Sequence, residues 1–169
     1  MNKKQIEIER KFIISKPSLA HISSLMGYSD SEITQTYIES PRGVTHRVRK
    51  RVTDGKAVYT ETKKIRLDKM SAIEEEREIT LEEYESLSGR IAKGTRPILK
   101  RRVTFSYSGK LFEVDIYPEW EKCAVLEIEL DSREESFAFP DFIRVIREVT
   151  GDFSYSNAAM SRAFPTEPV

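Results

Sequence analysis

The chain has 169 residues, of which 38% are hydrophobic and 33% charged, and its 28 basic and 28 acidic residues give a formal net charge of zero. This length predicts one globular domain over residues 1–169, and the balanced charge argues against a nucleic-acid partner, which usually requires a basic excess. The single cysteine, Cys123, excludes an intramolecular disulfide, and the lack of a long apolar run or of an apolar segment after Met1 predicts a cytoplasmic protein without membrane contact.

Alternation of apolar and polar residues predicts a first β-strand at residues 5–14. Ser15, with Pro17 just beyond it, then marks the start of a helix near residues 16–26. Alternation resumes in four segments with short connections, which favour antiparallel neighbours. These strands are expected at residues 33–39, 44–53, 57–66 and 73–79.

A second helix is predicted to follow and to end near residue 93, because Thr80 and Glu83 have the spacing of a capping box. Three more strands, with a hairpin turn at residues 108–109, are expected at residues 97–107, 110–117 and 124–131. After Pro140, apolar residues at helical spacing predict a third helix: Phe142, Ile143, Val145, Ile146 and Val149. Together these elements predict an α+β fold, namely an eight-stranded antiparallel closed β-barrel, or tunnel, with flanking helices.

The charged residues of the strands fall on one face each, because side chains two residues apart in a strand point the same way. Acids dominate this face in the first, fifth, seventh and eighth strands, and bases dominate it in the third and sixth. A solvated outer face is the ordinary explanation for any single strand. However, like charges such as Glu7 and Glu9, or Arg47 and Arg49, repel unless a counter-ion lies between them. The sorted charges therefore predict a charged lumen inside the barrel.

A carboxylate cluster beside an Arg/Lys cluster is suited to metal-assisted handling of phosphates. Carboxylate oxygens are the ligands that Mg²⁺ or Mn²⁺ prefers. Guanidinium groups bind phosphate oxygens through two parallel hydrogen bonds, and lysines supply point charge.

Glu7-x-Glu9-x-Lys11, within "IEIERKF", resembles the ExExK signature of the CYTH superfamily, the triphosphate tunnel metalloenzymes. Six companion motifs follow in the order of that family and span nearly the whole chain: "HRVRKR", "TKK", "EEEREI", "LKRRV", "FEVDIY" and "VLEIEL". The resemblance implies an eight-stranded tunnel that binds a small-molecule triphosphate and one or two Mg²⁺ or Mn²⁺ ions.

The resemblance also implies roles for individual residues. The catalytic residues would be Glu9, Lys11 and Glu78. The metal-facing acids would be Glu7, Glu9, Glu76, Glu78, Asp115, Glu127 and Glu129. The substrate-binding bases would be Lys11, Arg47, Arg49, Lys63 or Lys64, Lys100 and Arg102. The TxK spacing selects Lys64, whereas a one-residue slip in register would point Lys63 inward instead.

One segment departs from the pattern of the family. "EVTGDFSYSNAAMS" resembles a family segment that often carries a basic residue beside its Tyr and Asn, but residues 154–157 contain no base. Arg162, in the following turn, is the candidate replacement. Gln35 and Tyr37 share a strand face and are further candidates to line the tunnel.

The leading hypothesis is metal-dependent hydrolysis of inorganic triphosphate by a monomer or homodimer. Within the same fold, the alternatives are hydrolysis of thiamine triphosphate or a nucleoside triphosphate, and a class IV-type adenylate cyclase. Alternatives of other classes are a non-catalytic polyphosphate- or nucleotide-binding module, and an interaction domain with a solvated sheet face.

Overall fold

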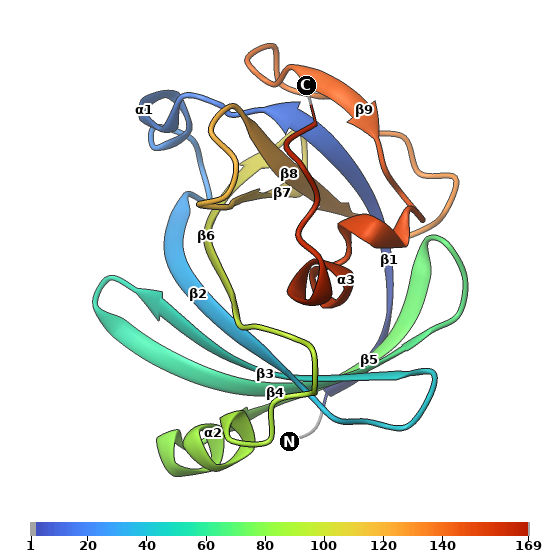
Figure 1. Ribbon diagram of the computed structural model, residues 1–169. Helices are drawn as coiled ribbons and strands as arrows, with labels where there is room; N and C mark the ends of the chain where they lie inside the picture. The colour runs from blue at the N-terminus through green and yellow to red at the C-terminus, as the bar shows by residue number, and fades with distance from the viewer. Residues whose placement is uncertain (1–2, 169) are drawn as a thin grey trace.

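The computed structural model describes residues 3–168, which form a closed antiparallel β-barrel with short helices around it (Figure 1). The strands in this part of the chain are β1 (Lys3–Ser15), β2 (Ser29–Ile38), β3 (Val44–Thr53), β4 (Lys56–Arg66), β5 (Ser71–Ile79), β6 (Ile98–Tyr107), β7 (Lys110–Ile116), β8 (Cys123–Glu129) and β9 (Val145–Glu148). Their order is β5-β4-β3-β2-β6-β7-β8-β1-β9, and a further pairing of β5 with β1 closes the first eight of these strands into the barrel. The predicted α+β barrel is confirmed.

The helices are α1 (Leu19–Ile22), α2 (Leu81–Ser88), the 3₁₀ helix η1 (Phe153–Tyr155) and α3 (Asn157–Arg162). The predicted capping box opens α2: the Glu83 backbone N–H donates to Thr80 Oγ1 at 3.1 Å, and the Thr80 N–H donates to Glu83 Oε2 at 2.8 Å. The first two predicted helices, expected near residues 16–26 and from Thr80 to about residue 93, are both shorter in the structure. None of the helices in the described residues has the length and apolarity needed to cross a membrane.

The prediction of a third helix after Pro140 is wrong. This region contains an irregular segment and β9, which pairs antiparallel with β1. Ile143 and Val149 are buried, whereas Val145 and Ile146 are exposed, so the apolar residues do not share one helical face. The edge of β1 beyond β5 offers backbone partners instead, and the Val149 N–H donates to the Lys11 carbonyl at 2.8 Å.

The apolar faces of the strands point out of the barrel, and chain segments cover two regions of this outer face. Around β1, β6, β7 and β8, outward residues such as Phe105 and Leu126 pack with Ile22 of α1 and with the segment 137–143. Around β2–β5, outward residues such as Val48 pack against α2. Complete burial of such a side chain stabilises the fold by about 1.5–3 kcal/mol, which explains why the charged faces point inward.

A third apolar cluster lies inside the barrel, beneath α3. Met160 of α3 packs among inward-facing residues that include Ile13, Tyr117 and Trp120. Figure 1, viewed along the barrel, shows α3 lying over the opening. The C-terminal segment therefore covers part of one end of the lumen.

Candidate active site

The barrel encloses a cavity of about 770 Å³ with a largely charged wall. Strands of the barrel and the segment 153–158 contribute to the lining. The predicted site residues that line this cavity are Glu7, Glu9, Lys11, Arg47, Arg49, Lys64, Glu76, Glu78, Arg102, Glu127 and Glu129. The structure thus brings together residues that lie up to 122 positions apart in the sequence (7 to 129).

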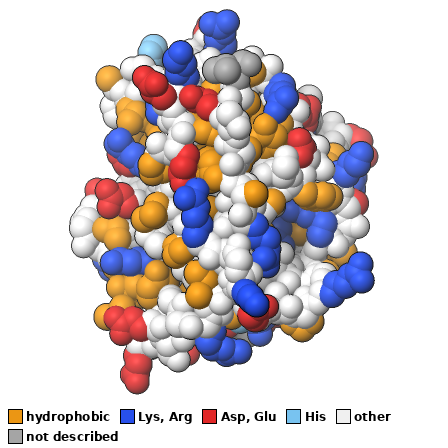
Figure 2. Space-filling model, in the orientation of Figure 1, with side chains coloured by type: hydrophobic (Ala, Val, Ile, Leu, Met, Phe, Trp, Pro, Cys, Tyr) orange, Lys and Arg blue, Asp and Glu red, His pale blue; other side chains and the backbone are white. Residues whose placement is uncertain are grey.

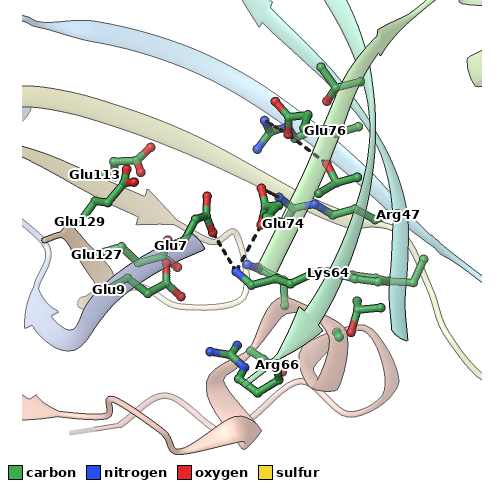
Figure 3. A pocket seen from close by; sticks show the side chains of 18 of the residues that line it. Glu7, Glu9, Arg47, Lys64, Arg66, Glu74, Glu76, Glu113, Glu127 and Glu129 are labelled. Atoms are coloured by element: carbon green, nitrogen blue, oxygen red, sulfur yellow. Dashed lines mark hydrogen bonds and ion pairs between the residues drawn. The ribbon is translucent and has the colours of Figure 1, made fainter. Parts of the chain in front are cut away.

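The strand order divides the wall of the cavity into two halves. The strands that carry acids, β5, β1, β8 and β7, are consecutive neighbours, and so are the strands that carry bases, β4, β3 and β6, with β2 between the last two. Figure 3 shows Glu9, Glu127 and Glu129 on one side of the cavity, and Arg47 and Lys64 on the other. An elongated anion between the halves would contact bases on one side and, through cations, acids on the other.

The acidic half contains carboxylates at directly opposed strand positions. Glu9 of β1 faces Glu129 of β8, and Glu127 of β8 faces Glu113 of β7 on one side and Lys11 of β1 on the other. Burial raises the pKa of Glu129, and the carboxylates of Glu113 and Glu9 raise it further. Lys11 Nζ lies 3.2 Å from Glu127, whereas within residues 3–168 neither Glu9 nor Glu129 forms an ion pair with a base.

Glu7 and Glu74 approach each other at the boundary between the two halves, with Lys64 bridging them. Lys64 Nζ lies 3.2 Å from Glu7 Oε2 and 3.3 Å from Glu74 Oε2. Burial raises the pKa of Glu7 to about 7, partly offset by Lys64, and neighbouring Glu74 adds to the increase. Burial acts in the same direction on Glu74, but Arg47 and Lys64 overcome it and hold the pKa of Glu74 below its ordinary value.

The basic half has guanidinium groups with unused donors. Arg49 Nη2 donates to Glu76 Oε2 at 3.5 Å, and Arg47 Nη2 lies 3.8 Å from Glu74 Oε1. The Nε atoms of both arginines are buried and have no hydrogen-bond partner among the described residues. Burial lowers the pKa of Arg49 to about 10, and the charge of Arg47 adds to this effect. Buried donors without partners are costly, so this wall is suited to an anionic ligand.

Two predicted residues lie behind the wall of the cavity instead of in it. Asp115, predicted to face a metal, accepts hydrogen bonds from Lys100 Nζ at 2.7 Å and from Arg102 Nε and Nη2 at 2.7 and 2.8 Å. The side chains of Lys100 and Asp115 are 1% and 0% exposed, and neither residue lines the cavity. Their charges satisfy each other and fix Arg102, whose Nη1 donates to Glu113 at 2.7 Å.

The choice between Lys63 and Lys64 is resolved by the register of β4. Lys64 lines the cavity, whereas Lys63 is exposed and is not part of the lining. The predicted substrate-binding role of Lys63 is therefore corrected. The alternative rested on a one-residue slip, and the observed pairing of Thr62 with Glu76 places the even-numbered residues of β4 inside.

At the C-terminal end, Arg162 does not replace the missing base. Its Nη1 donates to the Lys93 carbonyl at 3.0 Å, and it does not line the cavity. Tyr37 does line the cavity, whereas Gln35 is buried behind it and donates to the Tyr37 hydroxyl at 3.0 Å.

Several lining residues were not predicted as site residues. Glu74 and Arg51 share the inward parity of their predicted neighbours, so extending the period-two pattern along β5 and β3 identifies both. The same rule applies to Glu113 on β7 and to Arg66 at the end of β4. Phe153 and residues 156–158 gave no such signal, because only the tertiary fold brings them to the barrel.

The donor atoms of the acidic half fit a hard divalent cation. They are carboxylate oxygens, which suit Mg²⁺ or Mn²⁺. Within residues 3–168, no three His, Cys, Asp or Glu side chains are already arranged as a metal-binding group.

Comparisons with known proteins agree with this geometry. Among solved structures, the inorganic triphosphatase NE1496 is 26% identical with a TM-score of 0.59, and the comparison covers 94% of this chain and 96% of that one. A conserved protein from Pyrococcus furiosus is 25% identical with a TM-score of 0.56, covering 76% and 80%. A protein from Pyrococcus horikoshii OT3, at 16% identity and a TM-score of 0.58 with 95% and 91% covered, shares the fold.

No curated protein gives a significant match to the sequence. The CYTH domain family, however, matches residues 5–154. That match spans far more than half of the chain and includes seven barrel strands completely and all but the first two residues of β1. The chain belongs to the CYTH domain family.

Proposed function

We propose that this protein is a metal-dependent triphosphatase that hydrolyses inorganic triphosphate inside the barrel. The observation that carries the proposal is that the unpartnered Nε donors of Arg47 and Arg49 lie opposite a wall of carboxylates in the same cavity. The likeness to an inorganic triphosphatase over almost the full length of both chains supports it.

The basic half would hold the phosphates. Arg47 and Arg49 each have a free Nε donor in addition to their terminal nitrogens, and guanidinium groups match phosphate oxygens in a bidentate manner. Lys64 and Arg102 also line the cavity. A triphosphate carries several negative charges near neutral pH, so it would compete with Glu7 and Glu74 for Lys64.

The acidic half would hold Mg²⁺ or Mn²⁺. The proposed ligands are drawn from the carboxylates that line the cavity: Glu7, Glu9, Glu76, Glu78, Glu113, Glu127 and Glu129. Glu113 replaces Asp115 in the set of proposed ligands, because Glu113 lines the cavity. Asp115 lies behind the wall, paired with Lys100 and Arg102. A bound divalent ion would polarise phosphate oxygens and lower the pKa of water.

The residues of the chain would supply the remaining chemistry. Glu9 of β1 is the proposed acceptor for a proton from the attacking water. Glu78 lies seven residues beyond Ser71, the β5 partner of Ile8, and is therefore about 23 Å along the sheet from this point. The predicted catalytic role of Glu78 is not part of this proposal. Lys11 has a raised pKa: burial opposes its charge, but Glu127 and Glu9 outweigh that effect. Lys11 therefore stays cationic and would stabilise the charge that develops on the leaving phosphate.

Phosphate release from a panel of substrates tests the proposal. The purified protein is incubated with inorganic triphosphate, thiamine triphosphate and ATP, each with Mg²⁺ or Mn²⁺, and cyclic AMP is measured beside phosphate in the ATP reaction. We expect phosphate release with the highest kcat/KM for inorganic triphosphate and no release in EDTA. Cyclic AMP as the main product from ATP, or no phosphate from any substrate, would contradict the proposal.

A further inference from the structure

Within residues 3–168, Arg66 and Arg51 are the bases of the cavity without an acidic partner, and Arg51 Nε instead donates to Ser31 Oγ at 3.0 Å. Lys11, Arg47, Arg49, Lys64 and Arg102 each form an ion pair with at least one carboxylate. Within residues 3–168, no hydrogen bond or ion pair is found for the guanidinium of Arg66. This exposed side chain ends β4 at the rim of the cavity, and all of its donors remain available to a ligand.

An aromatic ring packs against the guanidinium of Arg66. The Cζ atom of Arg66 lies 5.3 Å from the centroid of the Phe153 ring, a distance typical of a cation–π contact, which is worth about 0.5–1 kcal/mol at an exposed site. Phe153 is 50% exposed, so one part of its ring remains accessible beside Arg66. Both residues line the cavity, and Figure 3 shows Arg66 beside the C-terminal segment, on the same strand as Lys64.

The segment that carries Phe153 is itself anchored. Asp152 caps η1 by accepting a hydrogen bond from the Ser154 N–H at 3.2 Å. Gly151 has a φ of +78°, and a Cβ added there would lie 2.8 Å from the Cβ of Lys69. Because Lys69 belongs to the loop that follows β4, the turn before Phe153 packs tightly against the chain just after Arg66. The chain segments that carry Arg66 and Phe153 are therefore packed against each other.

We propose that Arg66 is a substrate-binding residue at the rim of the cavity, and that Phe153 is the positioning residue that holds its guanidinium plane toward the triphosphate. This inference rests on the proposed function. Arg66 follows Lys64 on the same strand face, about 7 Å further along, and so extends the row of bases past the last one tied to carboxylates. The C-terminal segment would then contribute to phosphate binding through an aromatic ring, without a base of its own.

A double-mutant cycle tests the coupling of the two residues. The dissociation constant of inorganic triphosphate is measured by calorimetry in EDTA for the wild-type protein, Arg66→Ala, Phe153→Leu and the double variant. We expect about a tenfold weakening for Arg66→Ala, consistent with loss of a charge-assisted contact. We expect about a threefold weakening for Phe153→Leu, and a double variant no weaker than Arg66→Ala alone, because the ring acts through the guanidinium.

Two matched variants separate this role from a general effect of charge or folding. Arg162→Ala removes a base of the C-terminal region whose guanidinium donates to the Lys93 carbonyl. This variant should bind triphosphate as the wild type does. Arg66→Lys keeps the charge but not the flat guanidinium, and should be intermediate and insensitive to Phe153→Leu. Because both side chains are exposed, thermal unfolding midpoints should be unchanged.

The outcomes distinguish this inference from the proposed function. Wild-type affinity in Arg66→Ala, or additive effects of the two substitutions, would overturn the inference even if the protein is a triphosphatase. Tight triphosphate binding that is weakened by Arg66→Ala, but without hydrolysis under any metal condition, would retain the inference and refute the proposed activity. A wild-type protein that binds no triphosphate in EDTA would overturn the inference, and one that also binds none with Mg²⁺ or Mn²⁺ would refute both.

Discussion

Glu9 and Glu129 lie directly opposite each other across the β1–β8 pair, and both line the cavity. Opposed residues of neighbouring strands have Cβ atoms about 5 Å apart, and like charges in these positions destabilise a sheet. Burial and the surrounding carboxylates already raise the pKa of Glu129. A divalent cation between the two carboxylates would relieve this repulsion, so the pair is the place where metal affinity should be most sensitive to mutation.

Glu129→Gln should weaken Mn²⁺ binding at least tenfold, because it removes one of two opposed negative ligands at little change in volume. Calorimetric titration of the protein with MnCl₂ in the absence of substrate measures the effect. Asp131→Asn is the matched control, since Asp131 follows two residues later, is 97% exposed and is not part of the lining. Equal loss of affinity in both variants would show that the effect is one of overall charge and not of a site.

Lys64→Ala should lower kcat/KM for triphosphate about 10- to 100-fold, as expected when a charge-assisted hydrogen bond worth about 1.5–3 kcal/mol is lost. Lys63→Ala changes the neighbouring residue of β4, whose side chain lies outside the barrel, and should stay within about twofold of the wild type. Steady-state phosphate release measures both. A larger effect at Lys63 than at Lys64 would mean that the register of β4 differs from the one described.

The inward-facing residues were predictable from the sequence because a strand has a strict period of two. Once Glu9 or Arg49 is placed inside, the pleat fixes the direction of every second neighbour, and the apolar alternate residues supply the energy that turns the charged face inward. Glu74 was missed only because the pattern was not followed to the start of β5. The pattern predicts which face of the sheet a side chain occupies, but not whether that side chain reaches the cavity or lies behind its wall.

Whether an inward side chain reaches the cavity, and which distant residues it contacts, depends on how the strands pair. Alternation of residue types does not encode that pairing. Asp115 has the correct parity for the lumen, yet the neighbouring Lys100 and Arg102 on β6 occupy its carboxylate. Phe153 reaches Arg66 across 87 residues of sequence (66 to 153). The false helix after Pro140 has the same origin: spacing of apolar residues could not reveal that the edge of β1 would accept β9.

Asp115→Asn should destabilise the protein by about 3–5 kcal/mol, because it leaves two buried cations without their shared counter-charge. Urea unfolding measures this loss, and the affinity of the folded variant for Mn²⁺ should change less than in Glu129→Gln. The opposite pattern, with stability changed by less than about 1 kcal/mol but Mn²⁺ affinity lost, would restore the metal-binding role that the sequence motif implied for Asp115.

Glu7→Gln should stabilise the metal-free protein at alkaline pH. Burial raises the pKa of Glu7 from 4.5 in the unfolded chain to about 7 in the folded protein, so between these values the folded state binds the proton more tightly. The wild type therefore loses stability as the pH rises through this window and loses no more above it.

The variant cannot titrate at this position and keeps Glu74 as a partner for Lys64. At pH 8 it should be more stable than the wild type by about 1 kcal/mol, a value reduced from the full linkage because Glu7 retains some contact with solvent. Near pH 4.5 the difference should vanish, because Glu7 is then protonated in the folded wild type. Urea unfolding in EDTA at both pH values measures the effect, and a difference that does not depend on pH would mean that packing of the amide, and not ionisation of Glu7, is responsible.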